Sequence, residues 1–456
     1  MKGHAIPMQE TPKYRAYGLN NFRTIPQLAA LPEALKFDIE VVGHVLPFKA
    51  NSFVVDHLID WSKAPDDPLF ALTFPQRAML APAHYDEMAA LLRAGADTVS
   101  LRTAADRIRQ TLNPHPAGQT SHNIPSLDGE PLDGMQHKYR ETVLFFPRQG
   151  QTCHAYCSFC FRWPQFVGAT EMKFASREVD RLVEYLRLHP EVTDVLFTGG
   201  DPLIMSTAHL ATYLDALIQA GLPGLKRIRL GTKALSYWPY RFLTDPDAED
   251  LLQLFKRVTQ SGVQLAFMAH FNHPRELDPE PVCQAIARVR ESGAVIRTQS
   301  PVLAHINDDP LLWADMWNRQ VDLGCVPYYM FVARDTGAHD YFSVPLTRAW
   351  EIFRQAYQRV SGLARTVRGP CMSANPGKIQ VLGVSEIKGD EVLVMRFLQG
   401  RNPDWVHRPF FARSNPQATW LNELEPAFGD TRFFFEDELE HAYRDNRHGR
   451  HTEDYE

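Results

Sequence analysis

The sequence predicts an α/β protein whose central part is a partial (β/α)6 barrel. Two observations support this prediction: an apolar run and an amphipathic segment alternate between residues 141 and 362, and five of the amphipathic segments are followed by glycine. Strands joined by single helices are expected to run parallel, because parallel pairs require a crossover connection. In such architectures the functional residues lie in the loops after the strands.

The expected strands are apolar runs rich in β-branched and aromatic residues. They cover residues 141–148, 194–199, 227–233, 264–271, 295–303 and 326–335. The expected helices cover residues 176–189, 209–220, 247–261, 279–292, 308–323 and 345–361. Left-handed glycine caps are expected after five of these helices, at Gly221, Gly262, Gly293, Gly324 and Gly362.

Residues outside the barrel divide into two further segments. We expect residues 1–136 to form a mostly helical N-terminal domain, with clear helical patterns at 86–94 and 100–111 and a loop at 113–133. The barrel itself is assigned to residues 137–362.

The C-terminal segment, residues 363–456, is expected to contain a loop that carries Lys378 and then a pair of strands. The strand pattern covers 378–384 and 391–397. The tail after Glu436 is rich in His and acidic residues, and we expect it to be solvated or used in assembly, which leaves a homo-oligomer open.

The composition is that of an ordinary globular protein. The 456 residues include 48 Lys and Arg against 54 Asp and Glu, a net charge of −6. No stretch has the roughly 18 to 20 consecutive apolar residues of a membrane span, and the first 22 residues contain no apolar signal core. We therefore expect a soluble cytoplasmic protein that acts on small molecules, without a membrane or nucleic-acid partner.

Three of the six cysteines form a C-x3-C-x2-C motif directly after the first strand: Cys153, Cys157 and Cys160. Closely spaced cysteines in a cytosolic chain indicate metal or redox ligands. Three thiolates can hold three irons of a four-iron cubane and leave the fourth iron open to a chelating ligand. A structural zinc site, with His154 as a further ligand, is the alternative.

This motif, with Phe159 before its third cysteine, resembles that of the radical S-adenosylmethionine superfamily. The second strand ends in Gly199-Gly200-Asp201, which looks like the glycine motif that contacts the methionine amine in that superfamily. The resemblance implies a [4Fe-4S] cluster whose open iron binds S-adenosylmethionine and whose electron cleaves it to a 5′-deoxyadenosyl radical. It also implies an electron donor such as flavodoxin or ferredoxin.

Further segments resemble lysine 2,3-aminomutase and its relatives over about residues 137–400. They are His270-Phe-Asn-His-Pro274, Arg297-Thr-Gln-Ser300, Asn307-Asp308, Pro327-Tyr-Tyr329 and Pro376-Gly377-Lys378. By this resemblance, His270 and Gln299 line the S-adenosylmethionine site. Lys378 forms an imine with pyridoxal 5′-phosphate, through which a nitrogen can migrate between neighbouring carbons.

The resemblance also implies which residues bind the substrate. Arg162 matches the arginine that pairs with the α-carboxylate. Asp335 matches one of the two aspartates that hold the ammonium of lysine, but no acid occupies the second position, within residues 370–375. Lysine specificity is therefore not implied.

The remaining cysteines are not expected to bind metal. No cysteine follows Cys371, so the interface zinc of some relatives is not expected, and Cys283 and Cys325 are interpreted as small buried apolar residues.

The leading functional hypothesis is an isomerase, an amino-acid 2,3-aminomutase that acts on a free amino acid. Two other enzymes remain open: one that modifies a protein lysine, as a relative does on elongation factor P, and a radical S-adenosylmethionine enzyme without pyridoxal phosphate. The non-enzyme alternative is a binding protein stapled by zinc.

Overall fold

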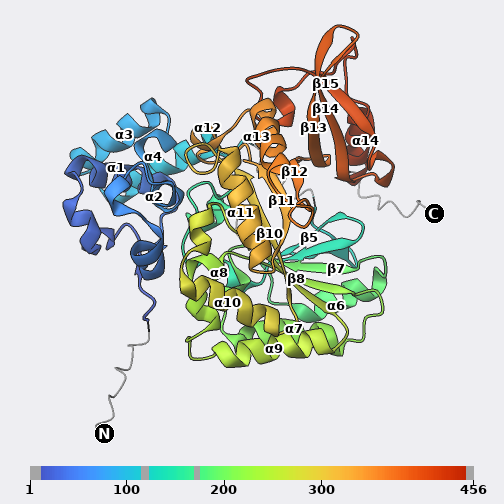
Figure 1. Cartoon of the computed structure of the whole chain (residues 1–456), viewed down its shortest axis with the longest axis horizontal. Helices are drawn as coiled ribbons and strands as arrows, with labels where there is room; N and C mark the ends of the chain where they lie inside the picture. Colours follow the sequence, from blue (N-terminus) through green and yellow to red (C-terminus); the bar gives the residue numbers. More distant parts are fainter. Residues whose placement is uncertain (1–11, 115–122, 169–174, 448–456) are drawn as a thin grey trace.

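The fold is known from a computed structural model that describes residues 12–114, 123–168 and 175–447. Its main feature is a mixed eleven-stranded sheet with the order β15-β14-β13-β12-β11-β10-β9-β8-β7-β6-β5 (Figure 1). Helices connect the central strands, so the α/β class predicted from the sequence is confirmed. No helix in these ranges is long and apolar enough to cross a membrane.

The centre of the sheet is parallel, as expected for strands that alternate with helices. The six predicted strands are β6 (Thr142–Phe145), β7 (Asp194–Phe197), β8 (Arg227–Thr232), β9 (Gln264–His270), β10 (Val295–Val302) and β11 (Val326–Val332). Each pairs in parallel with the next. A seventh parallel strand, β12 (Arg368–Ser373), pairs with β11. We predicted a loop at these residues, and this prediction was wrong. The strand could not be recognised from the sequence because β12 has Gly369 and Pro370 instead of an alternating apolar pattern.

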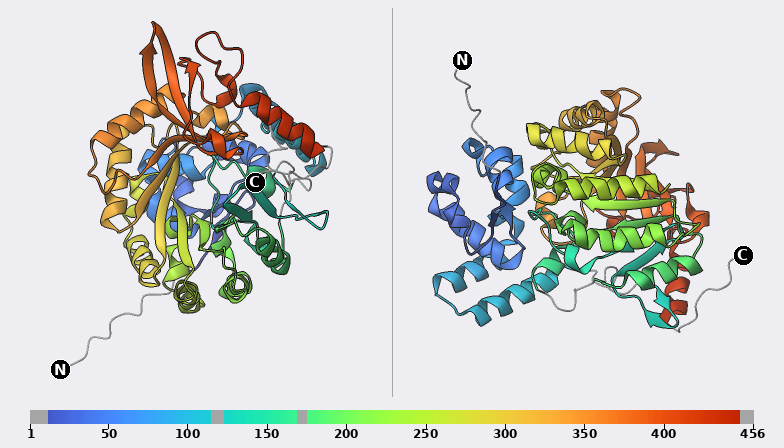
Figure 2. Two further views of the ribbon diagram at one scale, coloured as in Figure 1. Left: turned by 90° about the vertical axis from the view of Figure 1, so that its right-hand side faces the viewer. Right: turned by 90° about the horizontal axis from the view of Figure 1, so that it is seen from below.

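Helices cover the outer face of the parallel strands and follow an arc around them in the left view of Figure 2. They are α6 (Val179–Leu188), α7 (Thr207–Gln219), α9 (Ala248–Gln260), α10 (Glu280–Glu291), α11 (Pro310–Asp322) and α13 (Leu346–Gln358). Four of the expected glycine caps have positive φ, but Gly362 does not. Helix α13 ends at Gln358, so Gly362 lies beyond its last turn. Short helices α8 (Ala234–Tyr237) and α12 (His339–Phe342) follow β8 and β11.

Antiparallel strands complete both edges of the sheet. Strand β5 (Met135–Tyr139) pairs with β6 at one edge. At the other edge, β13 (Gly377–Ile387), β14 (Asp390–Gly400) and β15 (Pro409–Arg413) follow β12. The predicted strand pair corresponds to β13 and β14, which are both longer than predicted. Lys378 is the second residue of β13, so its placement in a flexible loop was wrong: its backbone is fixed by pairing with Ser373.

The N-terminal segment contains helices α1 (Glu33–Val45), α2 (Pro68–Thr73), α3 (Pro82–Arg93) and α4 (Thr98–Thr111). A short pair, β1 (Ala16–Tyr17) and β2 (Ala50–Asn51), lies beside them. The segment covers one end of the sheet in the right view of Figure 2. One hydrophobic cluster contains residues of both parts, for example Ile39 of α1 and Phe197 of β7. The N-terminal helices and the central strands therefore share a core.

Two further regions differ from the sequence prediction. The expected loop at 113–133 contains a small hairpin, β3 (Ser126–Leu127) and β4 (Glu130–Pro131). The expected polar tail begins with a helix, α14 (Glu436–Arg447). Its sequence is polar, but Glu, Leu, Ala and Arg have high helix propensity. A second hydrophobic cluster, which includes Ile379, Phe397 and Phe435, fills the space around β13, β14 and β15.

Candidate active site

The three motif cysteines lie in the loop after β6, at the carboxyl ends of the parallel strands. Burial raises the pKa of all three thiols, that of Cys160 to about 12. The charge of Asp201, and then those of Cys160 and Cys157, raise the pKa of Cys153 further. The loop thus brings together three half-buried cysteines, whose thiolates require a cationic partner.

The donor set of the loop consists of three cysteines. Within residues 12–114, 123–168 and 175–447, no group of three His, Cys, Asp or Glu side chains is arranged to hold a single metal ion. A four-iron cubane takes each thiolate on a different iron, so a donor set of three cysteines suits its chemistry and leaves one iron open.

The N-terminal segment holds the cysteine loop in place through buried hydrogen bonds. Lys49 donates from Nζ to the Cys153 carbonyl at 2.7 Å, and Asn51 donates from Nδ2 to the His154 carbonyl at 3.2 Å. Ser158 donates from its backbone to the Leu72 carbonyl at 2.9 Å. Sequence reasoning did not find these contacts, because each joins residues that are far apart in the chain.

The glycine motif after β7 packs directly on the cysteine loop. Gly199 has a φ of +127°, and a Cβ on Gly200 would collide with the backbone of Thr152. Beside Gly199 the Gln151 Oε1 atom is buried without a hydrogen-bond partner among the described residues, and Gln151 Nε2 donates to the Pro147 carbonyl at 2.9 Å. An unpaired buried acceptor fits a ligand that donates, such as the ammonium group of S-adenosylmethionine.

Asp201 is buried, and its carboxylate is engaged within the protein. Oδ1 accepts from the Leu203 backbone at 2.9 Å, and Oδ2 accepts from Thr232 Oγ1 and the Lys233 backbone, both at 2.8 Å. Asp201 therefore joins the ends of β7 and β8. These bonds suit a residue that positions the glycine motif.

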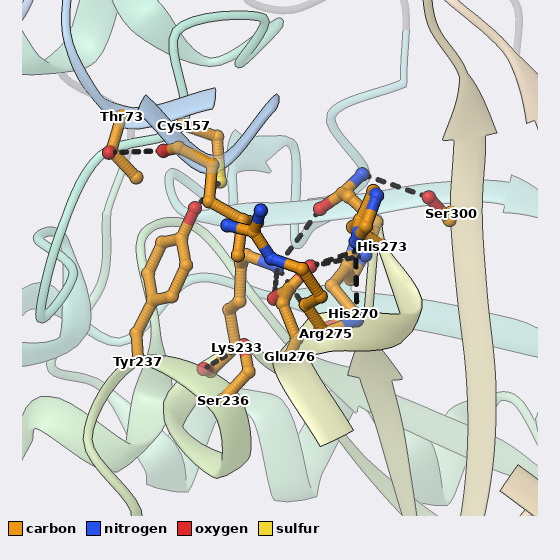
Figure 3. Close-up of polar contacts among 12 residues, drawn as sticks. Thr73, Cys157, Lys233, Ser236, Tyr237, His270, His273, Arg275, Glu276 and Ser300 are labelled. Atoms are coloured by element: carbon orange, nitrogen blue, oxygen red, sulfur yellow. Dashed lines mark hydrogen bonds and ion pairs between the residues drawn. The ribbon is translucent and has the colours of Figure 1, made fainter. Parts of the chain in front are cut away.

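His270 and Gln299 come together at the ends of β9 and β10. The Gln299 amide lies 2.7 Å from His270 Nε2. Burial lowers the pKa of His270 to about 3, so the ring is neutral and Nε2 can accept from the amide. Lys233, behind His270, forms a buried ion pair with Glu276 and donates to Asn272 Oδ1 at 2.9 Å (Figure 3).

Arg162 lies near Cys160 of the cysteine loop and near Arg334, which follows β11. Its side chain is 8% exposed, and its Cζ atom lies 4.3 Å from the centre of the Phe146 ring. Burial and then the charge of Arg334 lower the pKa of Arg162, whereas the nearby Cys160 raises it. A buried guanidinium in this setting favours an anionic ligand such as a carboxylate.

Lys378 is half-buried and lies against aromatic rings of β11. Its Nζ atom lies 4.2 Å from the ring centre of Tyr329 and 5.5 Å from that of Phe331. Burial, with smaller contributions from Arg229 and Arg368, lowers its pKa to about 8. A substantial fraction of the amine is then neutral near physiological pH, as a lysine that forms an imine requires.

Three basic side chains hold the turn that precedes Lys378 by donating hydrogen bonds to three successive backbone carbonyls. Arg334 donates to the Ser373 carbonyl at 2.5 Å, Lys138 to the Ala374 carbonyl at 2.5 Å and Arg401 to the Asn375 carbonyl at 2.9 Å. Burial lowers the pKa of Lys138 well below its usual range, and the charges that lower it further are those of Arg401, Arg334 and Lys378. Such a concentration of positive charge fits an anionic group like a phosphate.

Asp335 follows β11 and directly follows Arg334. Its charge raises the pKa of the Arg334 guanidinium, which burial lowers. The structure therefore places the candidate substrate acid beside a cation that also contacts the turn before Lys378. The sequence showed Arg334 only as the neighbour of a candidate residue, and Lys138 lies in a strand that was not predicted.

Comparisons with known proteins bear on the family to which the chain belongs. No protein-family model matches the sequence. A protein of Aquifex aeolicus named putative L-lysine 2,3-aminomutase is 31% identical over 393 residues, which cover 86% of this chain and 91% of that protein. The chain belongs to the lysine 2,3-aminomutase family of radical S-adenosylmethionine enzymes. The L-lysine 2,3-aminomutase of Escherichia coli is 31% identical over 257 residues, 54% of this chain and 71% of the relative.

Among solved structures, Streptococcus suis SuiB bound to S-adenosylmethionine is 14% identical, with a TM-score of 0.36 over 62% of this chain and 60% of SuiB. At this level the similarity supports no conclusion. Membership of the lysine 2,3-aminomutase family, in contrast, implies an enzyme that uses S-adenosylmethionine and a four-iron cluster.

Proposed function

We propose that the chain is an aminomutase that moves the α-amino group of a free amino acid to the β-carbon. In this proposal Cys153, Cys157 and Cys160 hold the [4Fe-4S] cluster, Lys378 holds pyridoxal 5′-phosphate, and a flavodoxin or ferredoxin donates the electron. Residues 137–362 act as a partial barrel, with the helical N-terminal domain over the end that carries the cysteines.

The observation that carries the proposal is a continuous set of buried and half-buried groups between Cys160 and Lys378. Arg162 lies beside Cys160 and beside Arg334. Arg334 and Lys138 hold the turn from which β13 and Lys378 begin. The two cofactor positions therefore face one interior, as an enzyme requires when a radical formed at one cofactor must reach a substrate bound to the other.

Each residue of the set has a task that its chemistry suits. When bound, the cluster and S-adenosylmethionine supply a radical, and pyridoxal phosphate supplies an aldehyde that holds the migrating nitrogen. Lys378 offers an amine that is partly neutral, Arg401 offers a cation to the phosphate, and Lys138 offers hydrogen-bond donors beside it. Arg162 binds and orients the substrate carboxylate.

The cysteine side of the site binds the other cofactor. His270 and Gln299 line the S-adenosylmethionine site, and Gln151 accepts a hydrogen bond from its ammonium group.

The test is an anaerobic assay of the full chain, reconstituted with iron, sulfide and pyridoxal phosphate, supplied with S-adenosylmethionine and reduced with dithionite. Lysine, ornithine, arginine, alanine, aspartate and glutamate are offered, and β-amino products are identified by mass spectrometry. We expect product from at least one amino acid, and none with Lys378→Ala or Cys157→Ala. A wild type that cleaves S-adenosylmethionine but yields no β-amino product from any of them contradicts the proposal.

A further inference from the structure

Tyr237 contacts a cysteine of the candidate cluster site from outside the cysteine loop. It is the last residue of α8, and its side chain is almost completely buried. Its hydroxyl lies 3.4 Å from Sγ of Cys157, and Figure 3 shows the ring directed at that sulfur. In the part of the chain that the structure describes, this hydroxyl has no other hydrogen-bond partner.

The chemistry of a ligated cysteine fixes the direction of this hydrogen bond. A cysteine bound to iron is a thiolate and has no proton, so the Tyr237 hydroxyl must be the donor. Hydrogen bonds to cluster sulfurs are one of the factors that set the reduction potential of an iron–sulfur cluster. A donor stabilises the reduced cluster more than the oxidised one, because the reduced cluster carries one more negative charge.

We infer that Tyr237 is a positioning residue that donates a hydrogen bond to Cys157 and thereby raises the reduction potential of the four-iron cluster. The inference rests on the proposed function, since it requires that the cysteines hold this cluster.

Two neighbours hold Tyr237 in the position to donate. Asn51 is fully buried, and its Nδ2 atom donates both to the Tyr237 carbonyl at 2.9 Å and to the His154 carbonyl at 3.2 Å. One amide group therefore fixes the distance between α8 and the cysteine loop. The Tyr237 backbone also donates to the Lys233 carbonyl at 2.9 Å, which closes the turn of α8.

The ring of Tyr237 also lies against a buried cation. Lys233 Nζ is 4.4 Å from the ring centre, and the ammonium is held by Glu276, whose side chain has no exposed surface. A cation over an aromatic face is attracted to the ring. This contact helps to hold the ring, and with it the hydroxyl, in its position toward Cys157.

The experiment measures the midpoint potential of the cluster in the reconstituted full chain, by an anaerobic redox titration followed by electron paramagnetic resonance, without S-adenosylmethionine. Tyr237→Phe is expected to shift the potential to a more negative value. A fluorinated tyrosine introduced at position 237 keeps the ring and the hydroxyl but is a stronger donor, so it is expected to shift the potential in the opposite direction. The matched control is Tyr213→Phe, whose lost hydroxyl donates to Gln149 at 2.8 Å and not to a cysteine.

Opposite shifts in the two Tyr237 variants, with four irons retained, support the inference. Wild-type potentials in both variants overturn it. If Tyr237→Phe does not retain the cluster, the fluorinated variant decides alone, and an unchanged potential there overturns the inference. A wild type that assembles no four-iron cluster fails the proposed function itself, so the two failures are distinguishable.

Discussion

The amide of Gln299 lies 2.7 Å from Nε2 of His270, and this contact joins the ends of two neighbouring strands. Burial lowers the pKa of His270 to about 3 in the folded protein, against roughly 6.5 for an unfolded chain. Between these values the unfolded state binds one more proton. His270 therefore contributes stability that is complete above about pH 6.5 and is lost as the pH falls toward 3.

The first prediction concerns this titration. His270→Gln should weaken the pH dependence of the unfolding free energy of the cofactor-free protein, by up to about 1.4 kcal/mol per pH unit below pH 6.5. Denaturant unfolding at several values between about pH 7 and 5 measures the slope. His209→Gln, an exposed residue of α7, is the control. Equal slopes for wild type and His270→Gln would show that His270 titrates normally.

The second prediction concerns the cluster ligands. Replacement of Cys153, Cys157 or Cys160 by Ala should abolish 5′-deoxyadenosine formation. Each of the three thiolates holds one iron and leaves the fourth open, so the loss of any of them leaves two irons without a protein ligand. Iron and sulfide analysis should show the loss of the intact cluster. Cys283→Ala removes a thiol that bonds to the Leu277 carbonyl, and it should retain full iron. Undiminished cleavage in any of the three variants would refute the assignment.

The third prediction concerns Lys378. Its pKa of about 8 means that the reactive neutral amine increases as the pH rises through 8, so incorporation of pyridoxal phosphate should increase between about pH 7 and 9. Borohydride reduction and peptide mapping should place the cofactor on Lys378. Lys378→Met should not be labelled, whereas Lys388→Met, at the exposed turn of the same hairpin, should be labelled normally. Label at another lysine would contradict the assigned role.

The fourth prediction concerns substrate choice. Asp335→Asn should lower kcat/KM for a cationic amino acid by about 10- to 100-fold, the typical range for a hydrogen bond to a charged group, and affect a neutral one much less. Competition assays with lysine, arginine, alanine, aspartate and glutamate measure the difference. Asp340→Asn changes an exposed acid nearby and serves as the control. A wild type that prefers an acidic substrate, with kinetics unaffected by Asp335→Asn, would exclude this role.

The fifth prediction concerns the attachment of the cysteine loop. Asn51→Ala removes hydrogen bonds to two buried carbonyls and to the Val54 backbone, so the unfolding free energy should fall by roughly 2 to 4 kcal/mol. The variant should also lose iron faster on dilution with a chelator. Asn318→Ala, on the exposed face of α11, should match the wild type in both measurements. Wild-type stability in Asn51→Ala would mean that the loop is held by other contacts.

The features that the sequence predicted correctly are those with a local pattern. Of the six predicted parallel strands, β9 and β11 have continuous apolar runs, β8 alternates apolar with polar residues, and the cysteine motif follows β6. Strand β12 was missed because its signal lies in its pairing with β11. For the same reason, local patterns placed Lys378 in a loop.

The contacts that complete the candidate site could not be predicted in this way. Tyr237 meets Cys157 across 80 residues of sequence, and Lys138 meets Ala374 across 236. Neither residue has an unusual neighbourhood in the sequence, because their roles arise only when distant segments fold together.

The contact between the N-terminal segment and the cysteine loop has a consequence for biosynthesis. Lys49, Asn51 and Leu72 precede Cys153 in the chain, so a ribosome makes the receiving surface before it makes the loop. Both partners of each of these contacts are therefore present once residue 158 has emerged, before α8 and the later strands are made. A nascent chain interrupted after residue 168 would already contain both halves of this contact, so we expect the order of synthesis itself to favour delivery of the metal to a prepared site.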